Sequence, residues 1–188
     1  VLQKIIEECI TVQDANVILA VPLSDLDIFS YYIDKVIVPD LWKNSKFIHG
    51  KNFSTFGGSE NNVLDRFYRA VTGNTPTHTE HPFSTQTVVR ITADCPLITT
   101  EIITSVLNYY RNVSCARADY VSNTTVKRGL SESEVDDFSS DTLMFDGTNI
   151  EVFSLQALEE AHNKATSQYD KEHVTPWIKR NKNCYLYE

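Results

Sequence analysis

The stretch that decides the fold is Thr87-Val-Val-Arg-Ile-Thr-Ala-Asp-Cys-Pro-Leu-Ile98. Its first six residues are mostly β-branched, which favours a strand, and we predict that 87–92 forms the central strand of a sheet. Apolar side chains recur at helical spacing over 100–110, so a helix is expected to follow. Asp94 lies just past the strand, and Pro96 fixes the turn between the strand and the helix.

Working outward from this stretch, strand-like and helix-like segments alternate along the chain. The expected strands are 17–21, 35–39, 87–92, 119–122, 149–153 and 184–187, and the expected helices are 2–10, 24–33, 61–71, 100–110, 154–165 and a broken stretch from Asp170. The segments expected to be loops are 50–60, 72–87 and 127–146. This alternation is typical of an α/β fold with a mainly parallel sheet and helices on both faces. A length of 188 residues suits one core, so we predict a single domain over 1–188.

Composition narrows the class of protein. The net charge of −8 argues against a nucleic-acid binder that is held by phosphate contacts. No apolar run approaches the ~18 residues that are needed to span a bilayer, so no membrane partner is expected. The four cysteines are scattered without a CxxC pair, which favours buried free thiols in a reducing compartment. Because no signal-peptide pattern opens the chain, we expect a cytoplasmic protein.

The candidate functional residues lie where strands end, because ligands of open parallel sheets bind beyond the carboxyl ends of the strands. Asp94 is well placed there to hold Mg²⁺ against a triphosphate, since Mg²⁺ binds one or two carboxylates plus phosphate oxygens. A turn or helix-capping aspartate explains the residue equally well. Both interpretations of Asp94 stay open on spacing alone.

Two further segments carry candidate polar groups. Residues 57–62 are small and polar and lead into a helix, where glycines allow close approach and the helix N-terminus favours anions. A simple loop-to-helix junction accounts for them as well. The segment from Asp146 to Glu151 opens a strand that faces the same edge, although acids in such positions are most often turn residues.

Five segments, taken together and in order, resemble a known family. They are Gly58-Ser-Glu-Asn-Asn-Val-Leu-Asp-Arg-Phe67, Val89-Arg-Ile-Thr-Ala-Asp-Cys-Pro-Leu-Ile98, Asp119-Tyr-Val-Ser-Asn123, Asn149-Ile-Glu-Val-Phe-Ser154 and Glu172-His-Val-Thr-Pro-Trp-Ile178. They resemble the spore coat polysaccharide biosynthesis protein F type of cytidylyltransferase, a relative of CMP-KDO synthetase. The resemblance covers nearly the whole chain.

The resemblance implies a three-layer, Rossmann-like nucleotidyltransferase fold. Such enzymes use Mg²⁺ and transfer CMP from CTP to a sugar or sugar acid for surface polysaccharide synthesis, releasing pyrophosphate. Carried onto this sequence, the implied metal position is Asp94, the implied nucleotide-binding positions are Gly58, Ser59, Asn62 and Arg66, and the implied substrate-binding positions are Glu151 and His173.

The sequence departs from the family pattern in two places. The family opens with a strand and a basic, glycine-rich loop that wraps the triphosphate, whereas this chain starts in the helix that would follow, so the fold is expected to lack the usual first strand. Asn149 stands where the family usually has a second metal-binding aspartate. An amide oxygen coordinates Mg²⁺ without adding charge, so a weaker metal site is expected.

These departures leave three hypotheses. The first is a CTP-dependent cytidylyltransferase, and the second is a non-catalytic nucleotide- or sugar-binding or assembly subunit derived from that fold. A glycosyltransferase is a weaker third, because Asp94-Cys-Pro lacks the second acid of an Asp-x-Asp motif. A missing central strand would expose the edges of its neighbours, so we also expect self-association into a homo-oligomer.

Overall fold

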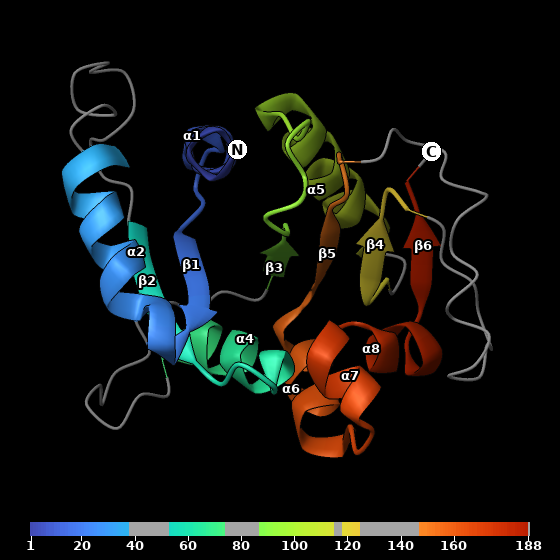
Figure 1. Ribbon diagram of the computed structural model, residues 1–188. Coiled ribbons are helices and arrows are strands. Elements are labelled where there is room, and N and C mark those ends of the chain that lie inside the picture. Colours follow the sequence, from blue (N-terminus) through green and yellow to red (C-terminus); the bar gives the residue numbers. More distant parts are fainter. Residues whose placement is uncertain (38–52, 74–86, 115–117, 125–146, 188) are drawn as a thin grey trace.

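The computed structural model describes residues 1–37, 53–73, 87–114, 118–124 and 147–187 (Figure 1). The elements of the first half are α1 (Leu2–Thr11), β1 (Val17–Pro22), η1 (Leu23–Asp25), α2 (Leu26–Tyr32), η2 (Ile33–Ile37), β2 (Phe53–Gly58) and α4 (Val63–Thr72). The second half contains β3 (Thr87–Arg90), α5 (Thr100–Ser114), β4 (Tyr120–Ser122), β5 (Glu151–Ser154), α6 (Leu155–Lys164), α7 (Gln168–His173), α8 (Pro176–Asn181) and β6 (Cys184–Leu186). Helices and strands alternate, which confirms the α/β class.

The strands form two sheets. β1 and β2 pair in parallel, and the second sheet has the order β3-β5-β4-β6. Its strands β3, β4 and β6 share one direction, because β3 and β4 each pair antiparallel with β5, while β4 and β6 are parallel. β5 is therefore the reversed strand of this sheet. The prediction of a central strand at 87–92 is wrong for the described part of the sheet, since β3 lies at its end.

Two other predictions of strands and loops were wrong. Residues 53–58, expected as part of a loop because of Gly57 and Gly58, form β2, whose aromatic and β-branched side chains outweigh its two final glycines. A strand was also expected over 35–39. Residues 35–37 belong instead to the π-helical turn η2, and residues 38 and 39 lie outside the described part of the chain.

The core lies on both faces of the four-stranded sheet. Val121 and Val152 pack in a cluster with α1 and α5, whereas their chain neighbours Tyr120 and Phe153 pack with α4, α6 and α8. Successive side chains of a strand point to opposite faces, so α5 covers one face and α6 and α8 cover the other. This arrangement gives the three layers that the resemblance implies.

Side-chain caps fix several helix starts. Ser154 accepts a hydrogen bond from the backbone N–H of Ala157 at 3.0 Å and caps α6, as predicted. α7 begins at Gln168, two residues earlier than expected, because Ser167 caps it through the N–H of Asp170.

None of the helices in the described residues combines the length and apolarity that crossing a membrane would require.

Candidate functional site

The turn after β3 and the segment before β5 meet at one edge of the sheet. Arg90, the last residue of β3, pairs with Glu151, the first residue of the antiparallel β5. An antiparallel pair places the end of one strand beside the start of the other. The backbone N–H of Leu97 then donates to the carbonyl of Gly147 at 2.9 Å. The predicted metal-binding positions Asp94 and Asn149 therefore lie in segments that contact each other.

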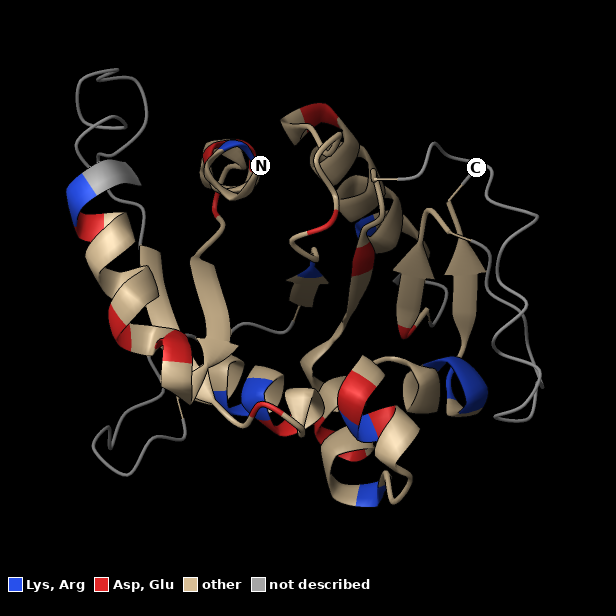
Figure 2. Ribbon diagram, in the orientation of Figure 1, with Lys and Arg blue, Asp and Glu red and all other residues tan. Residues whose placement is uncertain are grey.

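Asp94 lies in a tight turn with its carboxylate exposed. The backbone N–H of Cys95 donates to the carbonyl of Thr92 at 3.2 Å, and the Thr92 hydroxyl donates to the Asp94 carboxylate. The hydrogen bond from Thr92 lowers the pKa of Asp94, partial burial opposes that shift, and the nearby positive charge of Arg90 adds to it. Asp94 is thus an ionised, accessible carboxylate. Figure 2 shows a basic segment at the tip of β3 and an acidic segment on the loop that follows it.

A buried amide holds the segment that carries Asn149. The Asn123 side chain donates to the carbonyl of Thr148 at 2.7 Å and accepts from the N–H of Ile150 at 2.9 Å. It thereby clamps the backbone on both sides of Asn149. Among the described residues, the buried Oδ1 of Asn149 has no hydrogen-bond partner. A buried acceptor without a partner calls for an explanation, and a cation is one.

Gly147 allows these two segments to approach. Its φ is +84°, a conformation that favours glycine, and a Cβ there would lie 3.1 Å from Cδ of Pro96. The close packing of Gly147 on Pro96 therefore depends on the missing side chain.

The candidate metal ligands at this edge are oxygen atoms, which are the ligands that Mg²⁺ prefers. In the part of the chain that the structure describes, these ligands are the Asp94 carboxylate and the Asn149 amide oxygen, which accepts no hydrogen bond there. No group of three or more His, Cys, Asp and Glu residues that could hold a metal occurs within the described ranges. Mg²⁺ keeps several waters and accepts phosphate oxygens, so two protein oxygens match the way it binds beside a triphosphate.

Glu151, an implied substrate-binding position, is 7% exposed, and its carboxylate contacts four polar side chains. Its carboxylate lies 2.5 Å from Nη1 of Arg90 and 3.0 Å from Nζ of Lys179, and it accepts from the hydroxyls of Tyr120 and Thr175 at 2.7 Å each. Burial alone would raise the pKa of Glu151, but Lys179 and Arg90, together with these hydrogen bonds, hold it well below its usual range. The residue joins β3, β4, β5 and α8.

Burial and the adjacent carboxylate of Glu151 also raise the pKa of Tyr120 well above its ordinary value. Tyr120 therefore remains a protonated donor to Glu151 at neutral pH. The sequence motif 119–123 contains both this tyrosine and Asn123, but nothing in the sequence indicated what their side chains contact.

The four implied nucleotide-binding residues form a separate cluster at the start of α4. Asn62 caps the helix by accepting from the N–H of Asp65 at 3.0 Å, and its own N–H donates to Ser59 Oγ at 3.0 Å. Arg66 donates from Nη1 to the Ser59 carbonyl at 2.9 Å. Gly58 is packed so closely that a Cβ would lie 2.8 Å from Cγ of Arg66.

This cluster and the turn after β3 lie at different edges. In Figure 1, β1 points toward α4, β2 runs parallel to β1 and leads into α4, and the arrow of β3 points away from α4. The structure therefore brings the segments that carry Asp94 and Asn149 into contact, whereas Gly58 and Arg66 lie at the edge where α4 begins. Burial lowers the pKa of the Arg66 guanidinium, and its Nε is buried without a partner in the described residues.

His173 is exposed at the end of α7 and packs against the ring of Tyr169, with ring centroids 4.5 Å apart. Its carbonyl accepts from the N–H of Thr175 at 2.8 Å, and Thr175 in turn contacts Glu151. His173 is thus linked to the Glu151 network through its backbone carbonyl. Lys179, the second cation of that network, had no signal in the sequence that would have singled it out.

Residues 43–188 match the family model described as Cytidylyltransferase. A curated relative, an uncharacterised protein of Methanocaldococcus jannaschii, is 35% identical over 132 residues, which are 70% of this chain and 42% of the relative. The chain therefore spans less than half of that relative's length.

Solved structures share the fold. A cytidylyltransferase from Leptospira borgpetersenii matches 99% of this chain and 63% of its own, with a TM-score of 0.65 and 19% identity. The 4-diphosphocytidyl-2C-methyl-D-erythritol synthase from Anaerococcus prevotii matches 99% of this chain and 78% of its own, with a TM-score of 0.55 and 12% identity. CMP:2-keto-3-deoxy-manno-octonic acid synthetase complexed with CTP matches 100% of this chain and 78% of its own, with a TM-score of 0.53 and 12% identity.

Proposed function

The chain belongs to the cytidylyltransferase family, and from this premise we propose that it binds CTP with Mg²⁺ at the edge that carries Asp94 and Asn149. The observation that supports this most strongly is the pairing of β3 with β5. It puts an ionised carboxylate in contact range of the segment whose buried amide oxygen has no hydrogen-bond partner among the described residues. Hard oxygen donors of this kind favour Mg²⁺ with a phosphate ligand.

The reaction proposed is transfer of CMP to a sugar or sugar acid. A hydroxyl oxygen of the acceptor forms a bond to the α-phosphorus, the bond from that phosphorus to the bridging oxygen breaks, pyrophosphate leaves and the hydroxyl proton passes to solvent. Bound Mg²⁺ would offset the charge that develops on the phosphate oxygens. Asp94 and Asn149 would hold it, and the Thr92 hydroxyl keeps the Asp94 carboxylate ionised and oriented. The resemblance to the spore coat type supports a product used in surface polysaccharide synthesis.

A second candidate is nucleotide binding without turnover. Arg90, the cation nearest to Asp94 along the chain, is already paired with Glu151, and so is Lys179. Arg66 lies at the other edge. Transfer of a phosphoryl group needs cations that meet the developing charge, so this distribution favours a subunit that binds nucleotide and leaves catalysis to other groups.

Titration calorimetry of the chain with CTP, with and without Mg²⁺, tests the binding step. We expect Mg²⁺-dependent binding of CTP in preference to ATP, and a loss of at least about ten-fold in affinity for Asp94→Asn, because that change removes the only charge of the proposed metal site. Glu172→Gln, at an exposed acid on α7, should bind as the wild type does. Equal affinity for Asp94→Asn and the wild type would contradict the proposal.

Release of pyrophosphate in the presence of a panel of sugars and sugar acids separates the two candidates. Turnover with any acceptor supports the enzyme, and CTP binding without turnover across the panel supports the binding subunit.

A further inference from the structure

Asn123, which follows β4, is a buried polar side chain that holds the segment leading into β5. It is 0% exposed. Its amide group donates to the Thr148 carbonyl at 2.7 Å, and its Oδ1 accepts from the N–H of Ile150 at 2.9 Å. Both partners are buried as well. Hydrogen bonds are stronger away from water, so this side chain fixes the main chain on both sides of Asn149.

The turn after β3 also holds this segment. The N–H of Leu97 donates to the carbonyl of Gly147 at 2.9 Å, and the backbone of Asn149 forms a hydrogen bond with the Cys95 side chain. Each of the residues 147–150 thus has a main-chain group that is held by the turn or by the buried amide. The main chain of the segment is therefore fixed relative to the turn by the protein's own contacts.

A ligand on a fixed main chain favours one size of cation. Oδ1 of Asn149 is buried and has no hydrogen-bond partner among the described residues, so it is a candidate ligand whose backbone cannot shift easily. Mg²⁺ requires nearly ideal octahedral geometry with oxygen distances of about 2.0–2.1 Å, whereas Ca²⁺ accepts irregular geometry at about 2.3–2.6 Å. Holding the ligand in place for the smaller ion therefore disfavours the larger one.

We propose that Asn123 is a positioning residue that sets the preference of the site for Mg²⁺ over Ca²⁺, by holding the main chain around Asn149. The inference rests on the proposed binding of CTP and Mg²⁺ at Asp94 and Asn149. Asn123 acts through the backbone rather than as a ligand, because both polar atoms of its side chain already bind main-chain groups. Replacing a residue that orients a metal ligand typically costs about 10–100-fold in metal affinity.

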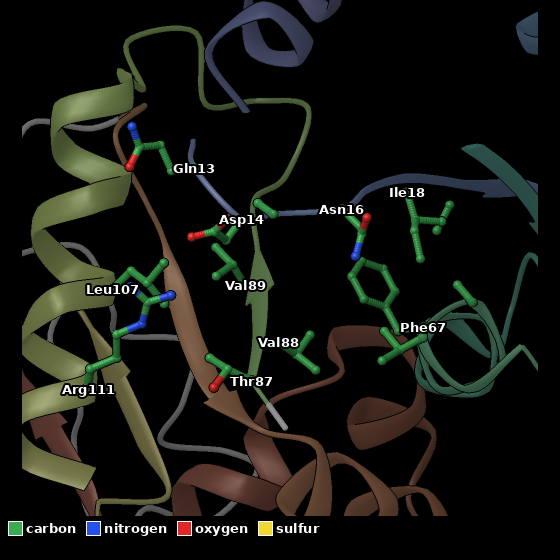
Figure 3. A pocket seen from close by; sticks show the side chains of 14 residues that line it. Gln13, Asp14, Asn16, Ile18, Phe67, Thr87, Val88, Val89, Leu107 and Arg111 are labelled. Carbon is green, nitrogen blue, oxygen red and sulfur yellow. The ribbon is translucent and has the colours of Figure 1, made fainter. Parts of the chain in front are cut away.

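A cavity beside β3 is the alternative place for a cation, and Asn123 does not line it. The cavity has a volume of about 340 Å³, and Asp14 is the acidic residue of its lining (Figure 3). The described residues that line it include 87–89 of β3 but none of 92–97 or 147–150. Asp14→Asn therefore tests whether a cation binds in the cavity instead.

The test measures the affinity of the chain for CTP by titration calorimetry, once with excess Mg²⁺ and once with excess Ca²⁺. Asn123→Ala removes both hydrogen bonds, so Mg²⁺-supported binding should weaken at least about ten-fold. Ca²⁺-supported binding should weaken less than about three-fold, because the larger ion tolerates a displaced ligand. The ratio of the Kd with Ca²⁺ to the Kd with Mg²⁺ should therefore fall at least about three-fold.

Two control variants separate positioning from a loss of stability. Ser154→Ala removes the cap of α6, so it should lower the stability and leave the ratio unchanged. Asn181→Ala removes an exposed asparagine that donates to the Trp177 carbonyl at 2.8 Å, and it should bind as the wild type does. Circular dichroism verifies that each variant folds. If Asn123→Ala does not fold, Asn123→Ser replaces it and should lower the ratio in the same direction.

A fall in the ratio that is confined to the Asn123 variant supports the inference. Equal losses with the two cations would show a purely structural side chain and would overturn it. A loss of Mg²⁺-supported binding in Asp14→Asn would place the cation in the cavity, which overturns it as well. If the wild type binds CTP measurably with Mg²⁺ alone, equal Mg²⁺-supported losses in Asn123→Ala and Ser154→Ala overturn it.

The wild type distinguishes this inference from the function on which it rests. Absence of metal-dependent CTP binding in the wild type would contradict the proposed function and the role of Asn123 together. Mg²⁺-dependent binding in the wild type, with the same cation preference in Asn123→Ala, would overturn the role of Asn123 alone.

Discussion

Glu151 is the residue whose surroundings differ most from what its sequence context indicates. The resemblance places it among residues that face the substrate, whereas its carboxylate is buried and contacts two cations and two hydroxyls. Sequence alone cannot distinguish these roles, because Arg90, Tyr120 and Lys179 come from distant segments. Asp94 was easier to predict, since its strand, its turn and its proline are contiguous in the sequence.

Glu151→Gln should lower the free energy of unfolding by about 3–5 kcal/mol at pH 7, because it leaves Arg90 and Lys179 without their buried counter-charge. The pKa of Glu151 is lower in the folded state than in the unfolded chain, so its contribution is complete above about pH 4.3 and is lost as the pH falls through the folded value. Urea unfolding at pH 7, 5 and 3 should therefore show a difference between variant and wild type that shrinks at the lowest pH.

Glu160→Gln is the control for this experiment. Glu160 pairs with Lys164 and Lys182 at the protein surface, and hydrogen bonds from both lower its pKa to about 2. The side chains of Glu160, Lys164 and Lys182 are 26%, 59% and 18% exposed, so water reaches these pairs, and this variant should lower the free energy of unfolding much less than Glu151→Gln does. Equal effects of the two substitutions would contradict a buried, structural role for Glu151.

Among the secondary-structure elements, those with local start signals were predicted best. Ser154 and the apolar pattern behind it located α6, and the apolar run 17–21 located β1 within one residue. β2 was missed because its final glycines indicated a loop, although a partner strand stabilises them. The start of α7 was placed late because Ser167 and Asp170 are both acceptable caps, and only the hydrogen bond from the N–H of Asp170 decides between them.

Asn62→Ala should destabilise α4 and cost the protein about 1 kcal/mol, because the side chain of Asn62 caps the helix through the N–H of Asp65. Asn62→Asp keeps the acceptor and should recover that stability. Thermal unfolding of these two variants beside Asn61→Ala, at the exposed neighbouring position, measures the effect. A Tm for Asn62→Ala equal to that of Asn61→Ala would show that the cap contributes nothing.

At the scale of the whole molecule, the alternation of helices and strands predicted the α/β class and the three layers but not the direction of β5. Strand direction depends on partners far apart in sequence, such as Val89 with Val152 and Val121 with Val152. That reversal brings the Asn149 segment to the Asp94 turn. The same topology leaves Gly58 and Arg66 at the edge where α4 begins, so the candidate residues divide into two groups that the sequence presented as one.

The most direct test of the proposed site is NMR of the chain with CTP and Mn²⁺, a paramagnetic substitute for Mg²⁺ that broadens nearby signals. We expect CTP-dependent broadening centred on the amides of Asp94, Cys95 and Asn149, with those of Gly58 and Arg66 much less affected. Broadening centred on Gly58 and Arg66, or equal broadening with and without CTP, would contradict a nucleotide–metal site at the edge formed by β3 and β5.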